Sequence, residues 1–555
     1  MGRRGQLVIL EGLACIEHEA VPVTFPPRAT GKASPPLELT ISDAVPSNPP
    51  TRIRPLTLSE LIVLILVAWA LWGMTAHAQL VPVKTVPLAT GSQFQLYPSE
   101  TRGMGGVTLA VDDTLGDAFV NPATAHRLDG TWAYSAPSHY TITENDGGAR
   151  TLSVGVLVDR GQWFGGIGGA LQQLTPGPKS RRRSVPFDPR FRPESRFRPE
   201  SLSIRPLRET SAENQYLTLL GGRQLTDQWV LAGTVQWAGL GAMEGVDLLY
   251  PGNRGLQQDG HRLDLRVGLL RDWNGQSLSV LLVHDRVDMQ HDVRRVEYVQ
   301  PNPDDQPVPR VQWERYYDRT NTWGLRLAYD RPLSADGWRL GTVLTGNRKD
   351  HPKIPNYDLM NIPRDPGTSW ASRIGVGVSH TGAHTTVGAD LLFEPIASET
   401  WANAQERIEQ PDGGTIAPGE RTVVNDFTFA NTTLRTGLRH HRAWWGLRGG
   451  LEVRTTRYWL TQDDRVVQSK RDQYESWSEW TLTWGGSVTW DVLTLRYTGR
   501  LTLGTGQPGV ISGLRAEFAA ASDVPVAPHG ALGVREAQVF THQVSLTLPI
   551  RGDTE

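Results

Sequence analysis

From residue 127 onward, hydrophobic and polar residues alternate one by one along most of the chain. Between Arg262 and Leu269 the even positions are arginine, aspartate or glycine, and the odd positions are leucine or valine. Successive side chains of a strand point to opposite faces, so such a segment lies between an apolar and a polar environment. The pattern recurs at 229–237, 323–329, 445–453, 493–503 and 544–550. It predicts a chain built almost entirely of β-strands.

The connections between the expected strands alternate in length. Short turns centre on Gly161, Asp227, Asn274 and Asp491, and Asn274 precedes a glycine, which is a strong hairpin signal. Longer connections cover about 143–149, 174–212, 240–259, 291–318, 349–369, 395–421, 461–474 and 505–534. Tight turns at one end and longer loops at the other are typical of outer-membrane barrels. We therefore expect a transmembrane antiparallel β-barrel of about 14–16 strands over residues 127–550, with 551–555 as a C-terminal tail.

Tryptophan positions give a second indication of membrane insertion. Seven tryptophans lie at or near the predicted short turns: Trp163, Trp229, Trp273, Trp338, Trp444, Trp445 and Trp490. An aromatic girdle at the periplasmic interface would place them there, whereas the alternative is that they are core aromatics of a soluble β protein. Against the barrel, the chain does not end in an aromatic residue, and Pro549 lacks a backbone donor near the end of the last strand.

The N-terminal region has the pattern of a leader. Residues 61–72 are apolar throughout, a run too short for a typical spanning helix, and Ala76-His77-Ala78 is a small-residue cleavage pattern. We interpret 51–78 as a signal peptide and expect an outer-membrane location. Residues 1–50 are Pro-rich and unlike a signal sequence, which indicates a start site placed too early; the alternative is a cytoplasmic extension on an uncleaved anchor. The only cysteine, Cys15, precedes the cleavage site.

Residues 103–123 combine a glycine-rich start, a central Asp-Asp pair and an Asn-Pro-Ala ending. This order resembles the N-terminal pattern of the FadL-like and PorV-like outer-membrane barrels, the long-chain fatty acid transporter superfamily. The resemblance implies that residues 79–126 fold into the barrel as a plug. It also implies which residues hold and kink that plug: Gly105, Gly106, Asp112, Asp113, Asn121 and Pro122. The alternative is an ordinary glycine-rich loop.

The polar face of the expected strands would line the lumen of a barrel. The candidates for this face are Arg262, Asp264, Arg266, Arg326, Asp330, Arg448, Glu452, Arg454, Arg496 and Arg500. Arginine outnumbers acid among them. One hypothesis is a basic lumen that admits anionic solutes or binds a carboxylate headgroup. The other is an Arg–acid network that only fills the barrel.

Composition and motifs narrow the remaining possibilities. A net charge of −2 gives no indication of nucleic acid binding. Neither a phosphate-binding loop nor a nucleophile elbow occurs in a suitable context, so we expect no enzyme activity, no cofactor and no metal site. The basic stretch 181–201 contains the tandem sequence Arg-Phe-Arg-Pro-Glu-Ser. It would contact anionic headgroups or a protein partner, or it is only a solvated, duplicated insertion.

By resemblance, the leading function is FadL-like passive uptake of a hydrophobic or amphipathic small molecule through the outer membrane. The arginine-rich lumen departs from a fatty acid carrier and places the purely hydrophobic substrate in doubt. The alternative is a PorV-like barrel that transports nothing and docks secreted or surface proteins. A third interpretation is an anchored, non-barrel β protein of the envelope.

Overall fold

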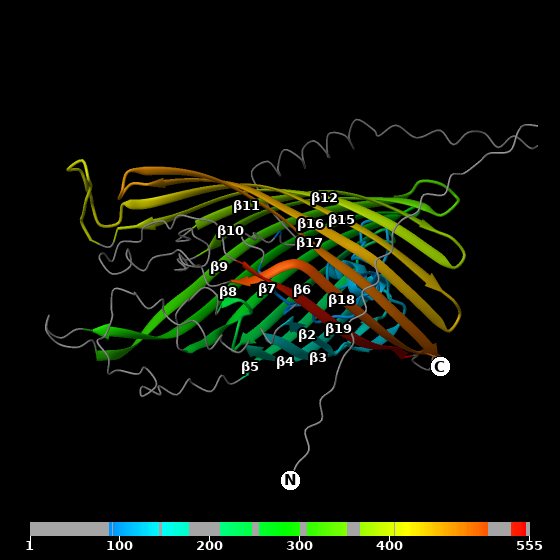
Figure 1. The fold of residues 1–555 in the computed structure, drawn as a ribbon. Helices are drawn as coiled ribbons and strands as arrows, with labels where there is room; N and C mark the ends of the chain where they lie inside the picture. The colour runs from blue at the N-terminus through cyan, green and yellow to red at the C-terminus, as the bar shows by residue number, and fades with distance from the viewer. Residues whose placement is uncertain are drawn as a thin grey trace, which may run out of the picture. The chain divides into compact units, whose positions relative to one another are not determined.

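The computed structural model describes residues 81, 88–91, 93–143, 147–176, 211–246, 255–299, 308–351, 367–404, 406–508 and 534–550. Strands dominate these residues, and the helices are short (Figure 1). None of the helices in this part of the chain has the length and apolar character needed to cross a membrane. The predicted leader 1–78, the basic stretch 181–201 and the tail 551–555 lie outside the described residues.

The strands form one antiparallel sheet, and from β2 onward each strand of the sheet pairs with the next along the chain. Its members are β1 Thr131–Ser135, β2 Ser138–Ile142, β3 Gly147–Asp159, β4 Trp163–Pro176, β5 Ala212–Gln224, β6 Trp229–Leu240, β7 Gly255–Trp273, β8 Gln276–Val299, β9 Val308–Pro332, β10 Trp338–His351, β11 Gly367–Thr381, β12 Thr385–Asn403, β15 Arg421–His441, β16 Trp445–Asp464, β17 Ser469–Trp490, β18 Leu493–Pro508 and β19 Val534–Ile550. A separate small hairpin joins β13 Ile408–Glu409 to β14 Thr415–Ile416.

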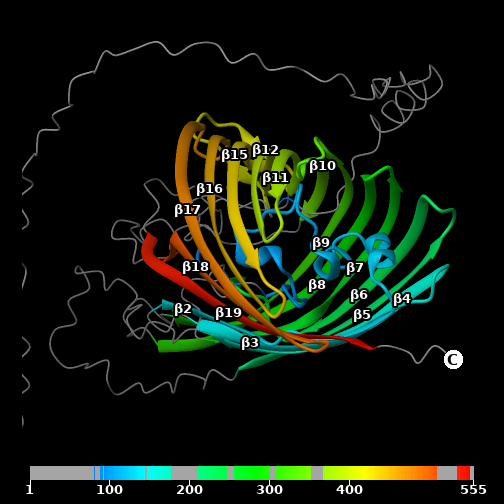
Figure 2. The ribbon, with the colours of Figure 1, turned by 90° about the vertical axis from the view of Figure 1, so that its right-hand side faces the viewer.

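The sheet closes on itself because the last strand pairs with the first. β19 pairs with both β1 and β2, and both of these also pair with β3. Only Ala136 and Pro137 separate β1 from β2, so these two segments form one interrupted strand. The seventeen segments of the sheet therefore make a closed barrel of sixteen strands, seen along its length in Figure 1 and nearly end-on in Figure 2. The predicted barrel is confirmed, and its last strand is present despite Pro549.

The wall has an apolar outer face and a largely polar inner face. On β12, Val387, Leu391 and Phe393 are exposed on the outside, whereas Asp390 and Glu394 point inward and are buried. An exposed apolar face of this kind is stable when lipid, rather than water, covers it. Closure of the sheet leaves no open edge, so no unpaired backbone group meets the hydrocarbon.

The predicted short turns agree with the structure. Several of the predicted longer connections, at the other end of the barrel, need correction. Most of 291–318 is strand, since β8 continues to Val299 and β9 begins at Val308. Similarly, β16 and β17 continue through most of 461–474, and β12 extends to Asn403 within the expected loop 395–421.

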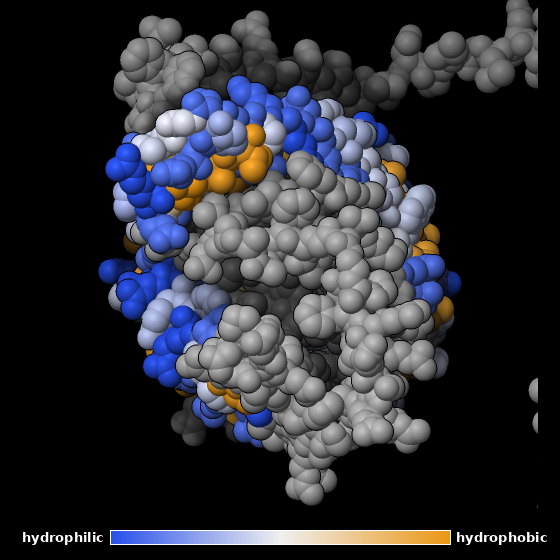
Figure 3. Space-filling view, turned by 60° about the vertical axis from the view of Figure 1, so that its left-hand side comes forward, coloured by the Kyte–Doolittle hydropathy of each residue, from blue (hydrophilic) through white to orange (hydrophobic). Residues whose placement is uncertain are grey.

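The alternation of apolar and polar residues did not predict these strand extensions, and the reason is physical. Polar pairs stabilise them: the Arg315 guanidinium lies 2.8 Å from the Asp292 carboxylate across β8 and β9, and Thr461 donates to Asp472 at 2.9 Å across β16 and β17. A strand that projects beyond the bilayer needs no apolar face. The alternation that reveals a membrane strand is therefore absent there. Viewed toward this end, the described rim is mainly hydrophilic, with hydrophobic residues visible between (Figure 3).

Candidate functional site

Aromatic residues border the apolar band of the barrel. At the tight-turn end, Trp163, Trp338 and Trp490 are exposed. The Arg271 guanidinium lies over the rings of Trp229 and Trp273, 5.2 and 4.7 Å from their centroids. Toward the other end, the outward-facing side chains include the exposed Trp323, Trp370 and Trp459.

Indoles with neighbouring cations at the edges of an apolar band mark the two membrane–water interfaces. The protein is an outer-membrane β-barrel. The tight turns correspond to the periplasmic end of such barrels, and the strand extensions project from the outer end.

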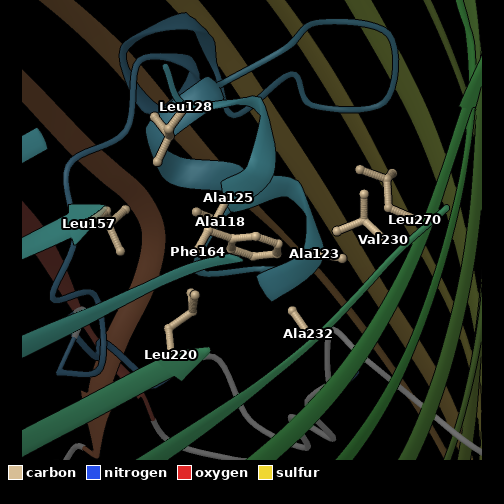
Figure 4. Close-up of a cluster of buried hydrophobic side chains, with 10 residues drawn as sticks. All are labelled: Ala118, Ala123, Ala125, Leu128, Leu157, Phe164, Leu220, Val230, Ala232 and Leu270. Carbon is tan, nitrogen blue, oxygen red and sulfur yellow. The ribbon is translucent and has the colours of Figure 1, made fainter. Parts of the chain in front are cut away.

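Part of the chain before β1 lies inside this barrel (Figure 2). We call residues 88–91 and 93–128 the inner segment. It contains the 3-10 helix η1 Thr101–Met104, the short helix α2 Thr114–Asp117 and the 3-10 helix η2 Pro122–Arg127. Its side chains pack on the wall in an apolar cluster formed by Ala118, Ala123, Ala125, Leu128, Leu157, Phe164, Leu220, Val230, Ala232 and Leu270 (Figure 4).

Glycines on both sides permit the close approach of the inner segment and the wall. Gly105 and Gly106 have φ angles of 70° and 74°, a conformation that glycine adopts without strain. The Gly105 amide donates to the Thr483 hydroxyl at 2.7 Å. On the wall, a Cβ at Gly437 or Gly450 would collide with the backbone at Met104 or Gly105. The first two residues of the predicted plug motif thus face the wall directly.

Asp113 organises the first part of the inner segment. Its buried carboxylate accepts hydrogen bonds from the Ser99 hydroxyl at 2.5 Å, the Glu100 amide at 2.9 Å and the Gly116 amide at 3.2 Å. Asp112 differs sharply: its side chain is 63% exposed and lies 3.8 Å from the Arg127 guanidinium. Only one of the two adjacent aspartates is therefore a buried structural acceptor.

Asn121 and Pro122 begin η2. The Asn121 side chain accepts from the Ala123 amide at 3.0 Å and donates to the Ser279 hydroxyl on β8 at 2.6 Å. Pro122 occupies the start of the helix, where its missing amide hydrogen costs nothing. Together they cap a helix and tie it to the wall.

The structure places all ten predicted lumen residues on the inner face. It brings Arg262, Asp264 and Arg266 together on β7, where Arg262 also reaches Asp285 of β8 at 2.7 Å. Arg266 donates to the Phe119 carbonyl of the inner segment at 2.6 Å. This part of the polar face is an ion-pair network that also holds the inner segment.

The other predicted lumen residues form separate groups. Glu452 pairs with Arg435 at 2.7 Å, Arg454 with Glu394 at 3.2 Å, and Asp330 with Arg339. Among the described residues, neither Arg326 nor Arg500 makes an ion pair within 4 Å.

Glu100 is the acidic residue of the inner segment whose carboxylate contacts several arginines of the wall. Its carboxylate lies 2.6 Å from Arg496, 2.9 Å from Arg439 and 3.8 Å from Arg448. Burial alone would raise the pKa of Glu100, but these three guanidiniums outweigh burial and hold the pKa below its usual value. Sequence reasoning missed Glu100 because no local pattern connects it with Arg496, which lies on the distant β18.

The outer half of the lumen has an apolar lining that the sequence analysis also missed. Phe427, Phe429, Tyr458 and Leu460 point inward from β15 and β16 and pack together. We call these four residues the outer apolar cluster. Along the same two strands toward the periplasm, the inward residues become Asn431, Arg435, Arg454 and Glu452. Two adjoining sections of one wall thus offer apolar and charged surfaces.

A polar crevice separates the inner segment from β7–β10 at the periplasmic end. Its open part has a volume of about 280 Å³ and is lined by Asp112, Asp117, Arg127, Asp272 and Arg339 among others. A narrower part of about 70 Å³ shares Asp112, Asp117 and Arg127 and reaches Arg326. Burial and the neighbouring Asp113 raise the pKa of Asp117 to about 7. No group of three or more possible metal ligands occurs in the described part of the chain.

No model of a protein family matches the sequence, and no curated protein matches it. Among solved structures, the chain is similar to the toluene transporter TbuX of Ralstonia pickettii, with 11% identity, 83% of this chain and 100% of that chain covered, and a TM-score of 0.34. It is also similar to a FadL homologue of Pseudomonas aeruginosa (12% identity, 82% and 99% covered, TM-score 0.41). A third is the toluene transporter TodX of Pseudomonas putida (12%, 84% and 100%, 0.34). Likeness at this level says nothing about the substrate. Evidence about the substrate must come from the residues that line the lumen of this chain.

Proposed function

We propose that the protein takes up amphipathic small molecules passively through the outer membrane, with the inner segment as its plug. One observation carries this proposal: the outer apolar cluster adjoins the charged section of the lumen on the same strands, β15 and β16. A molecule with an apolar body and a polar or anionic head would find a surface for each part. Neither a purely apolar molecule nor a small ion would use both sections.

The charged residues of the whole lumen favour an anionic head. Arg326 and Arg500 have no ion-pair partner within 4 Å among the described residues, and Glu394 is shared between Arg373 and Arg454. Guanidinium groups bind carboxylates through paired, charge-assisted hydrogen bonds. The polar crevice beside Asp117 and Arg127 would then give the head a hydrated route toward the periplasm.

In this proposal the inner segment controls the route, because η1 packs against β15–β18 and η2 packs against β3–β7 on the inner face of the wall. Gly105, Gly106, Asp113, Asn121 and Pro122 hold it in place through the contacts described above. Asp112 has a different role: it lines the crevice.

A second candidate function is docking of a secreted or surface protein at the outer end. The ladder between β9 and β10 ends at Asn321 and Asp350, whereas β9 continues outward to Val308. Trp313 and Tyr317 are exposed on this extension, 56% and 52%. Aromatic side chains beside a strand edge suit a protein partner.

Uptake by whole cells tests the proposal. The full chain is expressed in Gram-negative cells that lack their own long-chain fatty acid carrier, and accumulation of labelled decanoate and labelled maltose is measured. We expect faster decanoate uptake than in cells without the barrel, and unchanged maltose uptake. Equal acceleration of both solutes would indicate an unselective pore, and acceleration of neither would favour the docking function.

A further inference from the structure

A row of inward-facing polar residues crosses seven neighbouring strands in direct register. Each is the cross-strand partner of the next, or occupies the partner position where the ladder is interrupted. We call this set the polar row: Arg326 of β9, Thr345 of β10, Arg373 of β11, Glu394 of β12, Asn431 of β15, Thr456 of β16 and Trp477 of β17.

The row climbs from the periplasmic part of the lumen to its outer part. Arg326 lies toward the periplasmic end of β9, which ends at Pro332, and it lines the narrow part of the polar crevice. Trp477 lies in the outer part of β17, far from the periplasmic end at Trp490, and packs against the outer apolar cluster. The row therefore connects the two regions that the proposed uptake route needs to join.

Most members of the row have polar atoms without a hydrogen-bond partner among the described residues. These atoms are Nε of Arg326, Oγ1 of Thr345, both amide atoms of Asn431, Oγ1 of Thr456 and Nε1 of Trp477. Asn431 and Thr456 are 0% exposed, and Thr345 is 1% exposed. Buried polar groups are normally paired, and an unpaired one destabilises a fold. Several such groups in one register row indicate that they serve something other than the fold.

The charges of the row favour a ligand group that is anionic and accepts hydrogen bonds. The Glu394 carboxylate receives Arg373 Nε at 2.7 Å and Arg454 Nη2 at 3.2 Å, so one acid faces two guanidiniums. Arg326 adds a further positive charge at the lower end. Direct cross-strand partners lie about 5 Å apart, so a head group can reach the next member before it leaves the last.

We infer that the polar row is a track along which the anionic, hydrogen-bonding head of an amphipathic ligand moves from the outer apolar cluster to the crevice at Arg326. This inference rests on the proposed uptake function and adds the binding residues and the class of ligand, an organic anion with an apolar tail. Asn431 and Thr456 lie in the outer part of the track, directly before Trp477. They directly adjoin the outer apolar cluster, which holds the tail while the head binds.

The test removes the unpaired polar atoms of Asn431 and Thr456 from the outer part of the track. The variant carries Asn431→Leu and Thr456→Val, and the matched control carries Thr428→Val and Thr432→Val, whose side chains face outward on β15. Decanoate is the probe. We expect the track variant to lose about tenfold in decanoate affinity and uptake, and the control to match the wild type. Decylammonium, with the same tail and a cationic head, should bind at least tenfold more weakly than decanoate to the wild type.

Two measurements separate failure of the track from failure of the proposed function. Equilibrium dialysis of decanoate against the purified full chain reports binding, and whole-cell accumulation reports uptake. Wild-type affinity in the track variant would overturn the track. Binding that depends on the row, without any uptake by wild-type cells, would support the track as a binding site and overturn transport. Because the substituted atoms have no partners in the fold, the track variant should still show the heat-modifiable migration of a folded barrel; loss of that shift would contradict the inference that these atoms do not serve the fold.

Discussion

Asp113 binds the backbone amide of Glu100 at 2.9 Å, and the Glu100 side chain in turn reaches three arginines of the barrel wall. One buried acid therefore fixes the backbone from which a second acid extends to β15, β16 and β18. The attachment of the inner segment to this side of the wall depends on this pair.

Replacement of Glu100 by glutamine should loosen the inner segment without opening the barrel. The substitution removes the negative charge that Arg439, Arg448 and Arg496 share. We expect the free energy of local opening of the segment to fall by about 2 kcal/mol. Hydrogen exchange of the amides near Glu100 measures this quantity. Glu399→Gln is the control, because the Glu399–Arg421 pair is about 40% exposed and should contribute less than about 1 kcal/mol. Equal effects of the two changes would contradict the assigned role of Glu100.

The two adjacent aspartates should respond differently to the same change. Asp113→Asn replaces a charged acceptor of several hydrogen bonds, and we expect faster exchange of the Glu100 and Thr101 amides that donate to it. Asp112→Asn alters a mostly exposed side chain and should leave these amides unchanged. If Asp112→Asn accelerated exchange as much as Asp113→Asn, the distinction between the two residues would be wrong.

Two adjacent glycines of β16 provide a test of the contact between the wall and the inner segment. A Cβ at Gly450 would collide with the backbone at Met104 and Gly105, whereas a Cβ at Gly449 would meet nothing within 4 Å. Gly450→Ala should therefore displace the segment and increase its cleavage by protease, and Gly449→Ala should not. Both variants should keep the heat-modifiable gel migration of a folded barrel. Protection of the segment in Gly450→Ala would show that it does not lie against β16.

The inner segment should be held more firmly at pH 5 than at pH 8. Burial and the nearby Asp113 raise the pKa of Asp117 to about 7, above its unfolded value near 4. Stability from the protonated form is therefore fully present below pH 4 and is lost as the pH rises through 7. Glu100, whose pKa is lowered, stays ionised throughout this window. Hydrogen exchange of α2 at the two pH values measures the effect, and Asp117→Asn should remove most of it; an unchanged pH dependence would exclude Asp117 as its source.

The sequence predicted the barrel well because the membrane imposes one rule on every strand. Lipid requires an apolar outer residue at each alternate position, so the side of Arg262 or Arg496 follows from its neighbours alone. The rule ends where the strand leaves the bilayer. In the outer part of β15, Phe427 and Phe429 point inward and Thr428 outward, an inversion of polarity that local alternation cannot locate. The outer apolar cluster was missed for this reason.

The candidate site was harder to predict than the wall because its contacts join distant parts of the chain. Arg454 was expected to face the lumen, but its partner Glu394 lies on a strand that is not its neighbour. The polar row depends on the register of seven strands, and one residue of slip would turn a member outward. The sequence gives no means of fixing that register across long connections.

A structure of the full chain with 10-bromodecanoate bound tests the central claim most directly. Anomalous scattering locates the bromine, and the density locates the carboxylate. We predict the bromine among Phe427, Phe429 and Tyr458, and the carboxylate within hydrogen-bonding distance of Asn431, Thr456 or Arg454. Bromine found only on the outer, lipid-facing surface of the barrel would contradict the account.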